Sequence, residues 1–270
     1  MSEREPDTYT HGHSESVLRS HRWRTVENSA AYLIDRLVPG VEVLDVGCGP
    51  GTITIDIAAR VAPGRVVGLD AAADAIDAAR AAADQAGAAN LEVRVDDVYA
   101  LDADDASFDV VHAHQVLQHL TDPVAALREM RRVCRPGGVV AARDCVYRAM
   151  SWYPADPRLD RWLDVYCAVA EGNGGEPDAG SRLLGWAHAA GFGDVGTSAS
   201  AWCYAQPDER VWWGGLWADR ISSTQLAEQA VERGLATGDE LADLADAWRT
   251  WAAHDDAWFA VPHGEILAAP

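Results

Sequence analysis

Short apolar runs alternate with amphipathic stretches along the first 145 residues of the chain. The apolar runs are rich in β-branched residues and end at glycine or acidic residues, which is typical of buried strands. They predict strands at 41–46, 65–70, 91–95, 108–112 and 139–143, and helices at 52–61, 71–86 and 122–134. Strand and helix in regular alternation predict a doubly wound, mostly parallel α/β sheet with right-handed crossovers.

The chain on either side of this alternation has a different pattern. Residues 17–38 carry apolar side chains at helical spacing as far as Pro39-Gly40, which predicts an N-terminal helical cap. After residue 150 we expect helices at 157–171 and 181–190, strands at 194–205 and 257–268, and two further helices with capping boxes, Ser222 with Gln225 and Thr237 with Glu240. One domain is therefore predicted over 1–270, with the cap at 1–38, the core at 39–145 and helical insertions plus the last strands at 146–270.

Composition narrows the possible partners. The chain has 22 basic and 42 acidic residues, a net charge of −20, and every basic residue is Arg. The absence of Lys excludes Schiff-base chemistry and a Walker-type phosphate lysine. The negative charge argues against nucleic acid or an anionic membrane as the main partner.

Cysteine, histidine and hydropathy add three further expectations. The 5 cysteines are dispersed without a CxxC pair, so neither a disulfide framework nor a zinc knuckle is expected. His11 and His13 have no carboxylate or cysteine cluster to complete a metal site, so no metal is predicted. The N-terminus lacks an apolar signal segment, and no run approaches the roughly 20 apolar residues of a membrane span. We expect a cytoplasmic protein without a membrane partner.

A glycine-rich loop follows the first predicted strand and precedes a helix. Its glycines permit positive φ and close approach of the backbone to a ligand. The dinucleotide fingerprint G-x-G-x-x-G fails because position 52 is Thr. The pattern D-x-G-x-G-x-G fits without a gap, at Asp45, Gly47, Gly49 and Gly51.

Further motifs follow this loop in order. Asp70 ends the second strand about twenty residues on, where an acidic residue accepts hydrogen bonds from ribose hydroxyls, and Asp97 follows the third strand. The segments 107–111, 116–120 and 131–138 complete the pattern. This ordered set resembles the class I S-adenosylmethionine-dependent methyltransferases, in the small-molecule branch similar to ubiquinone/menaquinone-biosynthesis C-methyltransferases.

The resemblance implies a Rossmann-like sheet of seven strands whose final hairpin adds one antiparallel strand. It also implies S-adenosylmethionine as cofactor, with S-adenosylhomocysteine as product, and a cap that closes over the site. The implied cofactor-binding residues are Asp45, Gly47, Cys48, Gly49, Gly51, Asp70, Ala71, Asp97, Val98 and His114, together with Tyr9 and Trp23 from the cap.

Methyl transfer from a sulfonium depends mainly on positioning, and a general base matters only for a protonated nucleophile. His114 and His119, near the end of the fourth strand, are the candidate catalytic residues. Asp144, Tyr147 and Trp152 follow the fifth strand and are candidates for substrate binding. Many of the 11 tryptophans lie between 147 and 220, where they predict either an aromatic acceptor pocket, a second small core or a dimer interface.

We therefore predict methyl transfer to a small-molecule acceptor, aromatic or natural-product-like, by in-line displacement. The fourth strand ends in Ala113-His114-Gln115-Val116, not in the Asn/Asp-Pro-Pro-Tyr/Phe motif of amino-methylating nucleic-acid and protein enzymes. A non-catalytic cofactor-binding sensor or assembly protein is the alternative, and an NAD(P)-dependent oxidoreductase is a further one. A homodimer is possible.

Overall fold

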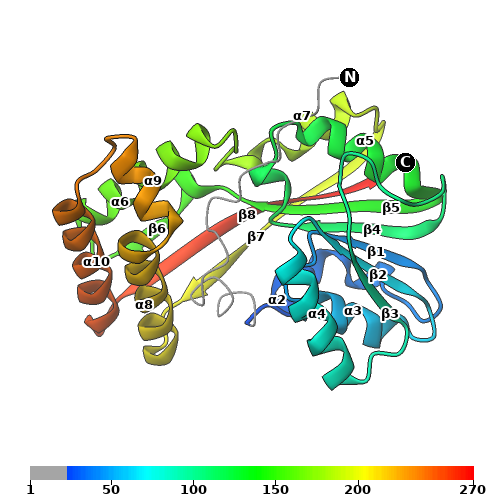
Figure 1. Ribbon diagram of the computed structural model, residues 1–270, viewed down its shortest axis with the longest axis horizontal. Helices are drawn as coiled ribbons and strands as arrows, with labels where there is room; N and C mark the ends of the chain where they lie inside the picture. The colour runs from blue at the N-terminus through cyan, green and yellow to red at the C-terminus, as the bar shows by residue number, and fades with distance from the viewer. Residues whose placement is uncertain (1–22) are drawn as a thin grey trace.

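The structure, a computed structural model, describes residues 23–270. The predictions for Tyr9, His11 and His13 therefore lie outside the described residues. The described chain forms an elongated molecule, with an α/β sheet at one end and a helical lobe at the other (Figure 1). None of its helices is long and apolar enough to cross a membrane.

One eight-stranded sheet organises the chain, in the order β3-β2-β1-β4-β5-β8-β6, with β7 paired to β8. The first five strands are parallel, as predicted, and the last three run antiparallel to their neighbours. The sequence analysis expected seven strands; the additional one is the short β6, which pairs with β8 beyond the end of β5. The strands are β1 Val43–Val46, β2 Val66–Asp70, β3 Leu91–Val95, β4 Phe108–His114, β5 Cys134–Cys145, β6 Ser151–Tyr153, β7 Asp194–Tyr204 and β8 Trp258–Ala269.

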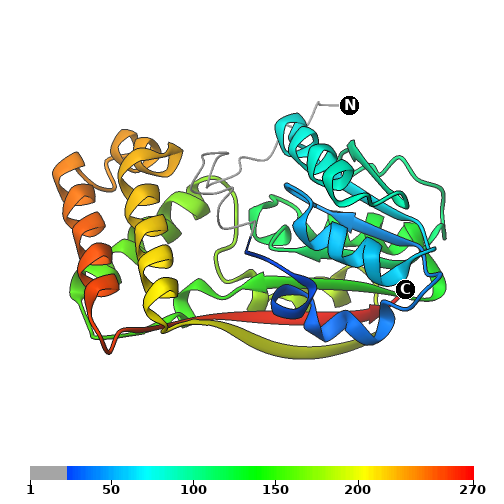
Figure 2. The ribbon, with the colours of Figure 1, turned by 90° about the horizontal axis from the view of Figure 1, so that it is seen from below.

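Helices cover both faces of the parallel part of the sheet (Figure 2). One face packs under α2 (Val26–Ser29), the 3-10 helix η1 (Ala31–Arg36) and α3 (Thr52–Val61), with α4 (Ala73–Ala86) beside α3. The other face packs under α5 (Pro123–Val133) and α7 (Leu183–Ala189). Strands buried on both faces explain the continuous apolar runs of the sequence.

The antiparallel pair of β7 and β8, whose strands are connected through α8 (Pro207–Ser223), α9 (Gln225–Glu232) and α10 (Gly238–Ala253), joins the sheet to the helical lobe. The two strands pair along their whole length, from Asp194 with Ala269 to Tyr204 with Phe259. Their outer half continues past the parallel sheet and carries a separate core. That core is built by β6 and by α6 (Pro157–Gly172), α8, α9 and α10, around the fully buried Trp162, Trp217 and Trp248.

Two predicted helix boundaries are wrong. The cap is not one helix in its described part, because Thr25 and Asn28 form a capping box that begins α2 at Val26. The backbone then breaks at Ala30 and continues as the 3-10 helix η1. Further along, Ser222 does not cap α9: it lies inside α8, and its hydroxyl donates to the Ala218 carbonyl.

The caps themselves follow ordinary hydrogen-bonding rules. Thr224 is the N-cap of α9, and its hydroxyl accepts from the backbone N–H of Leu226. Thr237 caps α10 as predicted by accepting from Glu240 N–H. Glu240 does not return the bond, because its carboxylate pairs with Arg161. Three short 3-10 segments complete the fold: η2 Leu117–His119, η3 Tyr147–Ala149 and η4 Ala179–Ser181.

Candidate functional site

The glycine loop between β1 and α3 has the backbone conformation that its sequence predicts. Gly47, Gly49 and Gly51 all have positive φ, at 69°, 53° and 83°. A Cβ on Gly47 would overlap the Val116 side chain, and one on Gly51 would lie 3.1 Å from Ala79 Cβ. A side chain would therefore be strained by its backbone conformation at all three positions, and at Gly47 it would also overlap Val116. The loop presents bare backbone at the carboxyl end of β1, the usual ligand edge of such sheets.

Asp45, in β1 just before the loop, fixes the start of the loop by two buried hydrogen bonds. Its Oδ1 accepts from His112 Nδ1 at 2.7 Å, and its Oδ2 accepts from the Thr54 hydroxyl at 2.6 Å. The residue is 3% exposed, so the carboxylate is bound to β4 and α3. Asp45 thus shapes the loop through buried hydrogen bonds, although it also borders the cavity described below.

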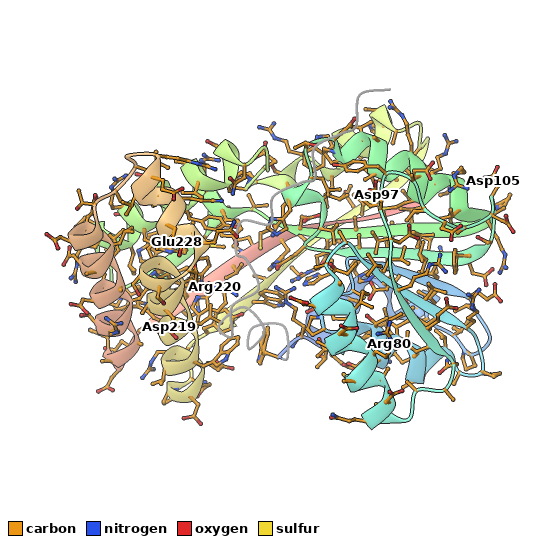
Figure 3. All side chains as sticks on the ribbon, viewed as in Figure 1. Arg80, Asp97, Asp105, Asp219, Arg220 and Glu228 are labelled. Carbon is orange, nitrogen blue, oxygen red and sulfur yellow. The ribbon has the colours of Figure 1, made fainter. Side chains whose placement is uncertain are left out.

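Asp70 and Asp97 lie at the same edge of the sheet. The Asp70 carboxylate accepts from the backbone N–H of Gly49 at 3.0 Å and of Ala72 at 2.9 Å. It therefore ties the glycine loop to the start of α4. Asp70 pairs in register with Val95 of β3, and Asp97 lies two residues after Val95. Asp97 is exposed and is labelled in Figure 3. Of the two other residues predicted here, Ala71 is exposed and Val98 is half-buried against the core.

A small cavity adjoins the glycine loop. Residues from β1, the loop, α3, the end of β4 and the cap surround it: Arg24, Asp45, Gly47, Cys48, Pro50, Thr52, Ile53 and His114. Four of these residues were predicted to bind the cofactor, namely Asp45, Gly47, Cys48 and His114. We therefore call this space the cofactor cavity. The Cys48 thiol is buried, and burial raises its pKa above the usual range, so it lines the cavity as a neutral thiol.

His114 is a buried, neutral imidazole in the wall of this cavity. Burial lowers its pKa well below the usual value, and the nearby cations Arg24 and Arg143 lower it further. Neither ring nitrogen has a hydrogen-bond partner among residues 23–270. The ring packs against Trp202 and His263, with centroids 5.7 and 6.3 Å away. His114 therefore offers one neutral donor and one weak acceptor to a ligand in the cavity.

Three other predicted residues, His119, Asp144 and Trp152, line neither this cavity nor the aromatic one described below. His119 is half-buried on η2, within 3.1 Å of Gln118 Nε2. Asp144 is fully buried and accepts from Gln118 N–H, and burial raises its pKa to about 8. Trp152 stacks on Phe259 as part of the lobe core. Asp144 thus supports the backbone at Gln118, and Trp152 packs against the lobe core.

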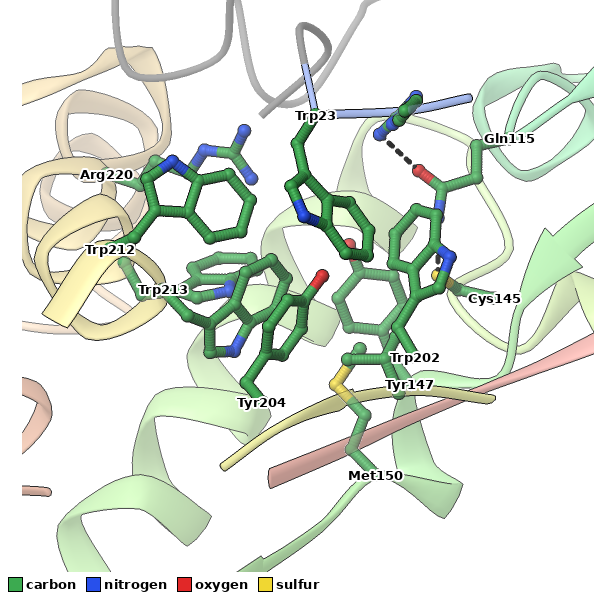
Figure 4. Close-up of a pocket in the computed structure, with 13 residues that line it drawn as sticks. Trp23, Gln115, Cys145, Tyr147, Met150, Trp202, Tyr204, Trp212, Trp213 and Arg220 are labelled. Carbon is green, nitrogen blue, oxygen red and sulfur yellow. Dashed lines mark hydrogen bonds between the residues drawn. The ribbon is translucent and has the colours of Figure 1, made fainter. Parts of the chain in front are cut away.

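A second cavity lies between the sheet and the helical lobe. It has a largely aromatic wall, drawn in Figure 4. Tyr147, the third predicted substrate residue, is part of that wall. The full lining is Trp23, Arg24, Gln115, Cys145, Tyr147, Met150, Trp202, Tyr204, Trp212, Trp213, Trp217, Arg220 and Val261. We call it the acceptor cavity.

The tryptophan-rich segment thus serves both as a pocket and as a core. Trp202, Trp212 and Trp213 line the acceptor cavity. Trp162 and Trp248 lie wholly inside the lobe, with ring centroids 4.7 Å apart in an edge-to-face arrangement. The composition of the segment could not separate these roles, since both require large apolar rings.

Gln115 lines the acceptor cavity and contacts Arg24, the residue that both cavities share, and the sequence patterns did not single out its side chain. Its Oε1 accepts from Arg24 Nη2 at 2.6 Å, and its Nε2 lies 2.9 Å from both Cys145 Sγ and His263 Nε2. Its backbone has φ of 55°, which is unusual for a residue other than glycine and is frequent at functional sites. Arg24 lines both cavities. The position of Gln115 just beyond a buried strand is the one signal that the sequence offers.

Comparisons with known proteins agree with this geometry. Residues 37–191 match the model of a methyltransferase domain family. An uncharacterized methyltransferase of Schizosaccharomyces pombe is 32% identical over 96% of this chain and 95% of its own length. A probable methyltransferase of Aspergillus luteorubrus is 30% identical over 97% of both chains. Among solved structures, the YcgJ protein of Bacillus subtilis superposes with a TM-score of 0.59 at 18% identity, over 88% of this chain and 96% of that one.

The fold and the glycine loop define a cofactor-binding, Rossmann-like enzyme. With the family match and the full-length relatives, the chain belongs to the class I S-adenosylmethionine-dependent methyltransferases, as its motifs predicted. Its cofactor is S-adenosylmethionine, and the nicotinamide alternative is set aside. No group of three His, Cys, Asp or Glu side chains in the described part of the chain is arranged to hold a metal ion.

Proposed function

We propose that the enzyme methylates a small organic acceptor, aromatic or natural-product-like, that binds in the acceptor cavity. One observation carries the proposal: this aromatic cavity meets the cofactor cavity at a shared residue, Arg24. A methyl group at that boundary has a short path to an acceptor on the other side. Aromatic side chains with a few polar groups among them are typical of small-molecule sites.

The residues around the cofactor cavity fit S-adenosylmethionine. We assign the ribose hydroxyls to the Asp70 carboxylate, the adenine side to Asp97, and the methionine portion to the glycine loop and His114. Arg24 is the one arginine in the described part of that lining and suits the methionine carboxylate. When bound, the cofactor supplies an electrophilic methyl group on a sulfonium.

The chain's own contribution to the reaction is mainly positioning. The acceptor cavity contains no carboxylate or imidazole among its described lining residues. Burial raises the pKa of the Cys145 thiol to about 12 and raises the pKa of Tyr147 and Tyr204 well above the usual value. None of these groups removes a proton readily near neutral pH. We therefore propose that the acceptor binds with its nucleophilic lone pair already available, and that alignment supplies most of the rate, up to roughly 7–11 kcal/mol.

Trp23 closes the acceptor cavity from the cap side. Its ring lies 5.4 Å from Trp202, 5.5 Å from Tyr204 and 5.7 Å from Trp212. This contact supports the predicted role of the cap as a cover over the site. Exclusion of water there protects the sulfonium from hydrolysis and strengthens electrostatic contacts.

Calorimetric titration with S-adenosylhomocysteine tests the cofactor assignment. We expect Asp70→Ala to weaken binding by about 1–3 kcal/mol, as for lost hydrogen bonds to a charged group. Asp74→Ala, an exposed acid in the first turn of α4, is the matched control and should leave binding unchanged. Equal affinity of Asp70→Ala and the parent chain would refute the ribose assignment.

Turnover separates the enzyme from a non-catalytic sensor. The full chain is incubated with methyl-labelled cofactor and a panel of aromatic acids, phenols and amines, and the products are analysed by mass spectrometry. A labelled product supports the proposal, whereas tight S-adenosylhomocysteine binding without any labelled acceptor favours the sensor. The predicted homodimer is checked separately by light scattering.

A further inference from the structure

A buried hydroxyl in the acceptor cavity lacks a hydrogen-bond partner. Tyr204, at the end of β7, is part of the described lining and is 0% exposed. Its Oη has no partner among residues 23–270. In Figure 4 this hydroxyl points away from the β7 backbone, into the space that Trp23 and Tyr147 border. Burial of a hydroxyl without a hydrogen bond costs free energy, so a ligand that supplies the missing partner gains affinity from it.

Ring contacts fix the direction of this hydroxyl. The Tyr204 ring is stacked on Trp213, with centroids 4.2 Å apart and planes 15° from parallel. Trp23 of the cap and Trp212 of α8 lie 5.5 and 5.8 Å from the same ring. The surrounding rings therefore keep the hydroxyl at one place in the cavity, and a ligand binds to it without the cost of ordering it.

The described lining supplies hydrogens rather than lone pairs. Burial raises the pKa of Tyr204 well above the usual value, so its phenol keeps the proton that it can donate. Five lining residues are tryptophans, whose indole N–H only donates, and Trp213 Nε1 also lacks a partner within the described residues. The Gln115 amide oxygen already accepts from Arg24. A ligand with hydrogen-bond acceptors therefore fits this cavity better than one that carries only donors.

We propose that the acceptor carries a carbonyl oxygen that accepts a hydrogen bond from the Tyr204 hydroxyl. This inference rests on the proposed function and narrows its substrate class to aromatic compounds with a ring-attached carbonyl group, such as aryl ketones. A neutral carbonyl brings two lone pairs into the cavity without the burial of a charge. Tyr204 lines the acceptor cavity and not the cofactor cavity, so the bonded oxygen is a recognition group and a different atom of the acceptor receives the methyl group. Tyr204 is on this view a specificity-determining residue.

The test compares a ketone with a hydrocarbon of the same shape. 2-Acetylnaphthalene and 2-isopropenylnaphthalene differ only in that a methylene group replaces the carbonyl oxygen. Each is bound to the full chain saturated with S-adenosylhomocysteine, and dissociation constants are measured by equilibrium dialysis. We expect the ketone to bind roughly 3- to 10-fold more tightly, the range for one neutral hydrogen bond. Tyr204→Phe, which keeps the ring, should remove this preference by weakening the binding of the ketone alone.

Melting temperatures give an independent readout. A hydroxyl that serves a ligand and not the fold lowers the stability of the ligand-free chain, so ligand-free Tyr204→Phe should melt at or above the temperature of the parent chain. A lower melting temperature would show that the hydroxyl is bonded within the chain, and it would overturn the inference.

Tyr153→Phe is the matched control. Tyr153 lies on β6 of the same lobe and is exposed, so the loss of its hydroxyl should leave the preference for the ketone unchanged. Equal affinity of the two probes for the parent chain, or no binding of either, overturns the inference even if Tyr204→Phe does not fold. A preference that survives in a folded Tyr204→Phe also overturns it. Failure of S-adenosylhomocysteine to bind is a separate result and refutes the proposed function instead.

Discussion

At the scale of single residues, burial sets the protonation of the groups around the site. His114 and His263 both have a pKa lowered well below the usual value, chiefly by burial, and stay neutral. The Cys145 thiol, 3.2 Å from His263 Nε2, is neutral for the same reason. The pair is therefore not a thiolate–imidazolium nucleophile, which would need an exposed, electropositive setting.

Asp144 gives the clearest pH-dependent prediction. The pKa of the Asp144 carboxyl is about 8 in the folded chain, above its value in the unfolded chain. Between these two pKa values the folded chain therefore binds one proton more than the unfolded chain. The stability from this group is complete below the unfolded pKa and is lost as pH rises through about 8. Asp144→Asn keeps an acceptor for Gln118 N–H and removes the titration. Relative to this variant, the parent chain should lose about 2–3 kcal/mol between pH 5 and 7.

Urea denaturation at several pH values measures this difference. Asp84→Asn, an exposed acid on α4, is the control and should track the parent chain at each pH. Parallel stability curves for Asp144→Asn and the parent would show that Asp144 is ionised in the folded state.

At the scale of elements, the junction between α8 and α9 depends on one hydroxyl. The predicted cap at Ser222 and the observed cap at Thr224 differ by two residues, and α8 continues through Ser223. Thr224 Oγ1 accepts from Leu226 N–H and also donates to the Arg220 carbonyl, so it ends one helix and begins the next. Local propensity could not choose between Ser222 and Thr224, which lie two residues apart; the packing of α8 did.

Two alanine variants test this boundary. Thr224→Ala should lower the free energy of unfolding by about 1 kcal/mol, the usual cost of a lost N-cap. Ser222→Ala should change it by less than roughly 0.5 kcal/mol, because its hydroxyl only bonds back to a carbonyl inside α8. Chemical denaturation of both variants gives the comparison, and the reverse order would restore the Ser222 cap.

At the scale of the whole molecule, the antiparallel pair of β7 and β8 connects two cores, and the acceptor cavity lies between them. The sheet core is aliphatic, whereas the lobe core is built on tryptophan. Trp202 and Tyr204 project from β7 into the cavity, and Trp212, Trp213 and Trp217 face it from α8. The proposed substrate contacts and the stability of the lobe therefore depend on the same residue type in neighbouring positions.

Trp162 and Trp212 separate the two contributions. Trp162→Ala should cost about 3–5 kcal/mol of unfolding free energy, because a fully buried ring leaves a large cavity. Trp212 is half-buried at the cavity, so Trp212→Ala should cost less than about 2 kcal/mol and weaken the binding of a phenolic probe such as 2-naphthol. Thermal denaturation and calorimetric titration of each variant measure both effects. Similar destabilisation by the two variants would place Trp212 in the core instead.

The sequence by itself determined the parallel sheet, the glycine loop and the cofactor. Those features depend on local patterns: apolar runs of strand length, glycines at positions that require positive φ, and acids at strand ends. Asp70 and Gly47 needed no tertiary information to be identified. The class of enzyme followed from the same short segments, taken in order.

The tertiary structure decided which residues meet across long separations. Arg24, Gln115, Cys145 and Arg220 converge on one cavity from the cap, β4, β5 and α8, and no local spacing records that convergence. Likewise, the tryptophans look alike in the sequence, and whether one lines the cavity or fills the core depends on the direction in which its helix or strand packs. Non-local packing therefore forms the proposed acceptor site, whereas local backbone requirements shape the predicted cofactor site.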